Sequence, residues 1–172
     1  LGSSGRVTMT GGTFDGTVAL AGGAELSIEA PTTIRFLEMT GGAISGLGPL
    51  TITLPQSELL GGTITVPLVE PPDTVGPTII YSSVIDGATY GNGLGRITIR
   101  FSEPMRPDSL VATNFFLLSE AGARIDPLAV SIGPRFSWIT LDVPLLATGR
   151  YRLVTAGDKL EDHRAGNRLA GG

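Results

Sequence analysis

The chain of 172 residues contains no cysteine, which excludes disulfide bonds, thiol catalysis and cysteine-based zinc sites. Charged residues make up 16% and aromatic residues 6%, and this charged share is well below the usual quarter. The basic residues are scattered and the net charge is −4. A protein that binds nucleic acid needs a clustered basic surface, so we expect no nucleic-acid partner.

Long apolar runs are also missing from the sequence. None approaches the roughly 18 residues of a membrane span, so no membrane span is expected. Residues Leu1 to Gly5 lack the basic start and apolar stretch of a signal peptide. The first residue is Leu1 rather than methionine, and we interpret the chain as a piece of a longer protein.

The sequence is rich in glycine and in residues that favour β-strands. The chain has 25 glycines and 12 prolines, and its ordered stretches are dominated by Thr, Ile, Leu and Val. These residues favour strands, whereas Gly and Pro favour turns. The composition therefore predicts an all-β protein with many turns.

A ten-residue motif near the start returns thirty residues later. It reads VTMTGGTFDG at residues 7–16 and LEMTGGAISG at residues 37–46. Glycine pairs at 41–42 and 61–62 are twenty residues apart, a spacing that suits one turn of a β-solenoid. The thirty-residue step then implies an irregular coil or an insertion.

We predict a short β-solenoid over residues 1–66, with a small Gly-rich β domain as the alternative. Its expected strands, separated by the glycine pairs, are residues 17–20, 24–29, 33–39, 50–54 and 63–66. The run from Met39 to Thr53 resembles the repeats of bacterial autotransporter-like and filamentous-haemagglutinin-like β-helices. The four prolines of residues 67–78 predict an extended linker.

Residues 79–172 have the pattern of an antiparallel β-sandwich. Short alternating runs, separated by turn residues every 8–15 positions, are typical of that architecture. In the run from Ser137 to Val143, the residues Ile139, Leu141 and Val143 share one side, which we expect to face the core. Trp138 then lies on the other side, partly exposed.

Ordered landmarks in this part resemble the bacterial Ig-like domain family over residues 73–172. They are Asp73 to Thr78 at the start, the turn Phe101 to Met105 (FSEPM), Asn114-Phe115, Gly149 to Tyr151, and Asp162 to Leu169 (DHRAGNRL). The resemblance implies an Ig-like antiparallel β-sandwich of the kind found in tandem on large secreted and surface proteins. It places the protein outside the cell or on the bacterial surface.

Candidate sites are few, and none predicts an enzyme. The single histidine, His163, follows Asp162, but neighbours on an extended segment point to opposite sides, which disfavours a catalytic pair. Oxygen-bearing side chains crowd the same loop and form a candidate calcium site, with turn formation as the alternative. This set consists of Asp158, Glu161, Asp162 and Asn167. Trp138 and Tyr90 are candidate platforms for a surface glycan.

The function that these observations favour is a non-enzymatic structural or adhesive module of a bacterial surface or secreted protein. A short solenoid has open ends, so its expected partners are upstream repeats or other copies of itself, joined head to tail into a fibre. The alternative is a polysaccharide-binding accessory module of a secreted carbohydrate-active enzyme. No cofactor is expected apart from the candidate calcium.

Overall fold

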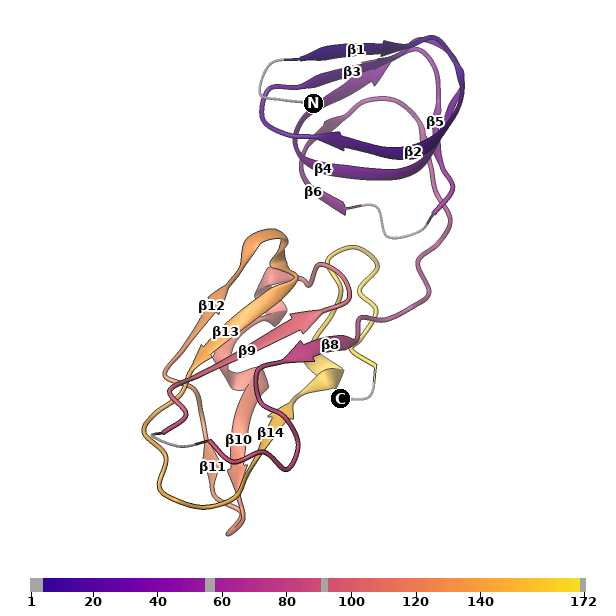
Figure 1. The fold of residues 1–172 in the computed structure, drawn as a ribbon. Coiled ribbons are helices and arrows are strands. Elements are labelled where there is room, and N and C mark those ends of the chain that lie inside the picture. Colours follow the sequence, from indigo (N-terminus) through magenta and orange to yellow (C-terminus); the bar gives the residue numbers. More distant parts are fainter. Residues whose placement is uncertain (1–4, 55–57, 91–92, 171–172) are drawn as a thin grey trace. The chain divides into compact units, whose positions relative to one another are not determined.

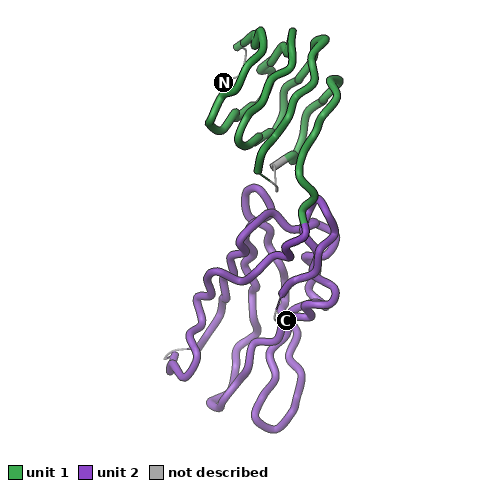
Figure 2. The backbone as a smooth tube through the Cα atoms, turned by 90° about the vertical axis from the view of Figure 1, so that its right-hand side faces the viewer, with its two compact units in different colours: residues 1–73 green, residues 74–172 purple. Residues whose placement is uncertain are grey.

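The computed structural model describes residues 5–54, 58–90 and 93–170. The chain divides into two compact units, residues 1–73 and 74–172 (Figure 2). This division falls inside the Pro-rich segment. The described residues form strands and short 3₁₀ turns, so the predicted all-β class is confirmed. None of the helical turns in this described part is long or apolar enough to cross a membrane.

The first unit is a β-solenoid, as predicted, because every strand pair in it is parallel (Figure 1). Successive strands wind into stacked turns rather than folding back as hairpins. The strands are β1 (Arg6–Met9), β2 (Gly12–Leu20), β3 (Glu25–Ile28), β4 (Thr32–Gly46), β5 (Leu50–Ile52), β6 (Glu58–Ile64) and β7 (Leu68–Val69).

A ladder of apolar side chains gives the length of each turn. Val7 pairs with Leu26, Leu26 with Ile44, and Ile44 with Ile64, so successive turns advance by 19, 18 and 20 residues. Leu26 and Ile44 are buried inside the coil. Stacking equivalent apolar positions buries a continuous core that no single turn could bury by itself.

The ten-residue motif that returns after thirty residues is not a structural repeat, so its spacing does not measure a turn of the coil. Val7 of the first copy pairs with Leu26, whereas Leu37 of the second copy pairs with Val18. The two copies therefore do not stack on each other. Thirty residues are about one and a half turns, so the coil needs no insertion to explain the spacing.

The glycine pair at 22–23 lies in the turn between β2 and β3, as expected, but the pairs at 41–42 and 61–62 do not end strands. Strand β4 continues through Gly41 and Gly42, with one half pairing along β2 and the other along β3. Gly42 has a φ of +84°, and a side-chain carbon there would collide with the carbonyl oxygen of Ala24 in the preceding turn. Glycine thus lets one strand turn a corner of the coil without breaking its pairing.

The second unit is an antiparallel sandwich, as predicted. One sheet has the order β11-β10-β14 and the other β12-β13-β9-β8 (Figure 1). The strands are β8 (Ile79–Ser82), β9 (Arg96–Phe101), β10 (Phe115–Ser119), β11 (Arg124–Ile125), β12 (Ala129–Ile132), β13 (Trp138–Asp142) and β14 (Tyr151–Thr155). Phe101, Phe115, Ile139 and Leu141 are among the buried residues of the core.

Short 3₁₀ turns occupy the connections of the sandwich. They are η1 (Pro107–Ser109), η2 (Ala112–Asn114), η3 (Pro134–Phe136) and η4 (Gly157–Lys159). Met105 and Leu110, on either side of η1, are buried in the core. Trp138 is 40% exposed while Ile139 and Leu141 are buried, which confirms the predicted facing of β13.

Candidate functional site

The carboxylate of Asp162 organises the last loop of the second unit. Its Oδ1 accepts the backbone N–H groups of Arg164, Ala165 and Gly166 at 2.9, 2.6 and 2.9 Å. Its Oδ2 accepts the N–H of Asn167 at 2.9 Å. Asp162 is 1% exposed. A buried carboxylate needs such donors, and four amides held by one side chain define the loop conformation.

The same loop is joined to the segment that follows β9. Met105 and Asp162 form an isolated antiparallel bridge, and the N–H of His163 donates to the carbonyl of Pro104 at 2.9 Å. The guanidinium of Arg106 pairs with the Glu161 carboxylate at 2.5 Å. Two stretches far apart in sequence are therefore fixed against each other.

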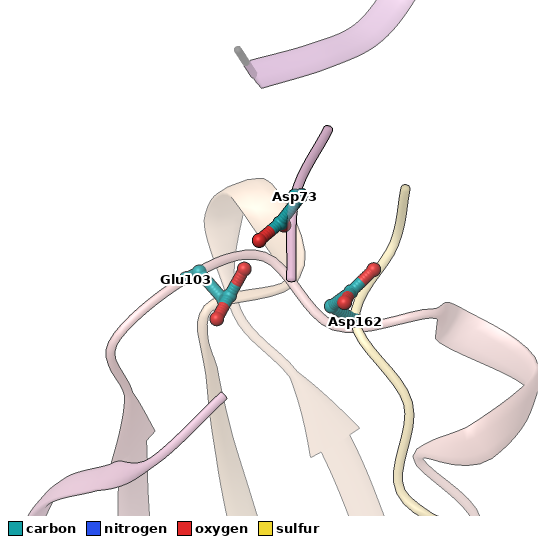
Figure 3. Close-up of side chains that lie close together, drawn as sticks. All are labelled: Asp73, Glu103 and Asp162. Atoms are coloured by element: carbon teal, nitrogen blue, oxygen red, sulfur yellow. The ribbon is translucent and has the colours of Figure 1, made fainter. Parts of the chain in front are cut away.

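Three carboxylates meet at this junction. Oxygen atoms of Asp73, Glu103 and Asp162 all lie within 4.8 Å of one another (Figure 3). Glu103 and Asp162 are buried. Like charges at this separation repel strongly where water is scarce, so a nearby positive charge stabilises the arrangement. We call these three residues the carboxylate cluster.

The chemistry of the carboxylate cluster suits a hard cation. Ca²⁺ takes six to eight oxygen ligands, and the cluster supplies oxygens from three carboxylates. An ionised carboxylate has about four acceptor positions, and four backbone amides already occupy Asp162. A cation here would therefore take its other carboxylate ligands from Asp73 and Glu103, with backbone carbonyls or water completing the coordination shell.

The structure does not bring the four predicted calcium residues together in one site. Glu161 is paired with Arg106, and the side-chain amide of Asn167 donates to the carbonyl of Val75 at 3.4 Å. Asp158 is exposed in η4. Of the four predicted residues, Asp162 alone belongs to the carboxylate cluster.

Sequence reasoning missed Glu103 and left Asp73 in the linker. A signal was nevertheless present, because each cluster member is the acidic residue of a separate Ig-like landmark. Asp73 opens the first landmark, Glu103 lies in FSEPM, and Asp162 opens the last. Acidic positions in three separate landmarks of one domain family are a reason to test whether they converge.

Asp162 and His163 do not form a catalytic pair in the described residues. The Asp162 carboxylate accepts hydrogen bonds from backbone amides, and the His163 ring lies beside Phe136 with a centroid separation of 5.9 Å.

Burial lowers the pKa of the neighbouring Arg164 guanidinium from its ordinary value, yet an arginine remains protonated at neutral pH.

The two aromatic residues predicted to bind a glycan, Trp138 and Tyr90, lie on a sheet face and in a loop, respectively. Trp138 lies on the outer face of its sheet, directly opposite Arg100 of β9. The Tyr90 hydroxyl accepts the N–H of Ile85 at 2.6 Å and donates to the carbonyl of Ser83 at 3.2 Å. Tyr90 therefore closes the loop after β8, whereas the Trp138 ring is displayed on a strand.

Fold and site together define a two-unit β protein, in which a parallel solenoid precedes an antiparallel sandwich closed by an acidic loop. Residues 73–172 match the family described as bacterial Ig-like domain, and the chain belongs to that family. A comparison with curated proteins gives no match.

Solved structures of an S-layer protein, SbsC, are similar to part of the chain. The crystal structure of a long SbsC segment matches with a TM-score of 0.44 and 20% identity, over 57% of this chain and 13% of that one. A structure of SbsC domains 1–6 matches with a TM-score of 0.43 and 20% identity, over 56% and 13%. The chain thus spans about an eighth of these SbsC chains.

Proposed function

We propose that the chain is a non-enzymatic structural module of a bacterial surface or secreted protein, whose solenoid is continued by further coils. These coils are upstream repeats of the same protein or the solenoid of another copy, which gives head-to-tail association. Membership of the bacterial Ig-like family supports the surface location, since such domains occur in tandem on surface proteins. The incomplete burial of apolar side chains in the first solenoid turn supports the association.

The first turn is covered on one side and uncovered on the other. Val7 and Val18 are half-buried, whereas Leu26 and Leu37, their partners in the next turn, are at most 1% exposed. Positions that carry the same kind of side chain thus differ in burial because no described turn precedes β1 and β2. A preceding coil would bury these side chains as β3 and β4 are buried.

The strands at both ends of the coil also have one edge without a pairing strand among the described residues. Within the described residues, β1 pairs with β3 alone and β2 with β4 alone. β6 pairs with β4 and β7 with β5 at the other end of the coil. Parallel strands are normally covered on all sides, and an uncovered edge is a template for pairing with another chain. The two ends are complementary because both are parallel edges of one coil.

A proline at the uncovered edge of β1 tests this association. The carbonyls of Gly5 and Met9 accept the N–H groups of Glu25 and Glu29. Because bonding direction alternates along a strand, the N–H of Thr8 points to the uncovered edge. Thr8→Pro removes that donor, so we expect the dissociation constant of the assembly to rise at least about tenfold. Sedimentation of the full chain over a concentration series measures it.

Leu145→Pro is the matched control, because Leu145 is 90% exposed in a loop of the second unit. This variant should associate like the parent chain. Equal association of the parent chain and Thr8→Pro, with unchanged strand signal in circular dichroism, would refute edge pairing. A parent chain that is monomeric at all concentrations would leave continuation by upstream repeats as the remaining form of the proposal.

A second candidate role is calcium-dependent stiffening of the second unit. The proximity of the Asp73, Glu103 and Asp162 carboxylates favours it. At a calcium concentration ten times the dissociation constant, ligand binding stabilises the folded state by about 1.4 kcal/mol. For a unit of this size we then expect the melting temperature to rise by about 5 °C or more in millimolar Ca²⁺.

The fluorescence of Trp138, the single tryptophan, follows this melting transition within the second unit. Glu103→Gln should abolish the calcium response, whereas Glu120→Gln, at an exposed turn, should keep it. A melting temperature that does not change in millimolar Ca²⁺ would remove calcium from the role of this module.

A further inference from the structure

The outer face of the sheet β12-β13-β9-β8 carries a row of three large side chains on neighbouring strands. Trp138 of β13 lies opposite Arg100 of β9, and Arg100 lies opposite Tyr81 of β8. Residues paired across strands point to the same face of a sheet. All three are exposed, Trp138 by 40% and Tyr81 by 54%. We call them the Trp138 row.

The Trp138 row places a cationic residue on the strand between two strands that carry aromatic residues. No described residue forms an ion pair or side-chain hydrogen bond with Arg100. Arg96 lies on the same face, four residues earlier on β9, and is paired with Asp142 at 3.0 Å. The positive charge of Arg96 is thus balanced within the protein, while that of Arg100 is left to solvent or to a ligand.

The backbone around Trp138 is shaped to hold its ring. A side-chain carbon at Gly133 would collide with the indole, so glycine there leaves room for the ring over the chain. Arg135 and Phe136, in the connection leading to Trp138, have φ values of 58° and 54°. Such left-handed conformations are costly for residues other than glycine and persist where the surrounding structure holds them.

Polar side chains continue the face beside the Trp138 row. Ser131, Thr140 and Thr98 are paired across β12, β13 and β9 in the next row on the same face. Protein-binding surfaces have a contiguous apolar centre. Here the backbone positions of the two aromatic residues are two strand spacings apart, about 10 Å, with Arg100 on the strand between them and hydroxyl-bearing residues in the next row. This pattern suits stacked sugar rings that carry an acidic group.

We propose that the Trp138 row binds an anionic polysaccharide, with sugar rings stacked on Trp138 and Tyr81 and a carboxylate or phosphate of the glycan on Arg100. This binding site goes beyond the structural role of the solenoid and does not depend on it. The whole chain has a net charge of −4, which repels a polyanion in general. Binding must therefore come from this local arrangement, through the charge-assisted hydrogen bonds of a free arginine.

The experiment titrates the full chain with polygalacturonate and with phosphomannan while Trp138 fluorescence is recorded. Because Trp138 is the single tryptophan, a change in its emission reports occupancy of the row itself. We expect saturable binding to at least one of the two polymers. Trp138→Ala, assayed by affinity electrophoresis, should weaken binding by about tenfold or more, as loss of a central aromatic contact does. Tyr81→Ala should weaken it less.

Matched variants separate the charge of Arg100 from charge in general. Arg100→Gln should lose the preference for polygalacturonate over its neutral methyl ester, which has the same sugar backbone. Arg96→Gln removes the same charge from the same face and should keep that preference. Gly133→Ala retains the indole but displaces it, so weaker binding by this variant would show that the ring position matters.

Three results would overturn the proposal. One is the absence of binding to both polymers. Another is equal loss of binding in Arg100→Gln and Arg96→Gln, which would mean an unspecific charge effect. The third is an equal fluorescence response to polyglutamate, an acidic polymer without sugar rings, which would point to an acidic peptide instead. The association measured with Thr8→Pro is independent of all three results.

Discussion

Asp162→Ala is expected to destabilise the second unit by about 3–5 kcal/mol. The variant removes the acceptor of four backbone N–H groups in a residue that is 1% exposed. A hydrogen bond to a charged group contributes about 1.5–3 kcal/mol, and bonds that share one acceptor are not additive. The loss should therefore exceed one such bond but fall short of four.

Unfolding by urea, followed by the emission of Trp138, measures this change. Asp162→Asn keeps one carbonyl oxygen as an acceptor and should lie between the parent chain and the alanine variant. Asp158→Ala is the control, since Asp158 is exposed in the neighbouring turn η4, and its stability should change by less than about 0.5 kcal/mol. A change of that small size in Asp162→Ala would mean that the loop holds its shape without the carboxylate.

Gly46→Ala is expected to disrupt the stacking of the solenoid, with a cost of about 3 kcal/mol or more. Gly46 has a φ of +127°, and a side-chain carbon there would collide with the carbonyl oxygen of Ile28 in the preceding turn. The conformational strain costs roughly 1–3 kcal/mol, and relief of the backbone clash requires neighbouring turns to separate. Separation would also break the pairing of β3 with β4.

Gly12→Ala is the matched control for this variant. Gly12 has a φ of +100° but open space where the new carbon would lie. It should show only the conformational cost, roughly 1–3 kcal/mol, without the added cost of a clash between turns. Trp138 lies in the other unit, so hydrogen exchange of the strands from Glu25 to Gly46, measured by mass spectrometry, is the suitable assay. Equal protection in the two variants would show that contact between turns at Gly46 is not tight.

Much of the fold could be predicted because its local patterns are strong. Alternation in Trp138 to Asp142 gave the right inner face, with Ile139 and Leu141 buried. The Ig-like landmarks led to the antiparallel sandwich, and the glycine spacing between 41 and 61 matched the turn from Ile44 to Ile64. Each of these signals lies within one strand or one turn.

The errors arose where pairing between distant segments decides the outcome. The motif at residues 7–16 and 37–46 repeats in sequence, yet its copies pair with other segments. Register in a coil follows from which side chains fit together in the shared interior, and the similarity of two ten-residue segments does not encode it. Gly42 was interpreted as a break because its role depends on the carbonyl of Ala24 one turn away.

The sequence by itself determined the all-β class, the change from solenoid to sandwich, and the outward position of Trp138, because strand alternation and turn chemistry are local properties. Tertiary structure alone decided that Asp73, Glu103 and Asp162 meet, and that Arg100 is paired with Trp138 on one neighbouring strand and with Tyr81 on the other. Those arrangements depend on strand order and register. They emerge only when the whole unit buries its apolar side chains together.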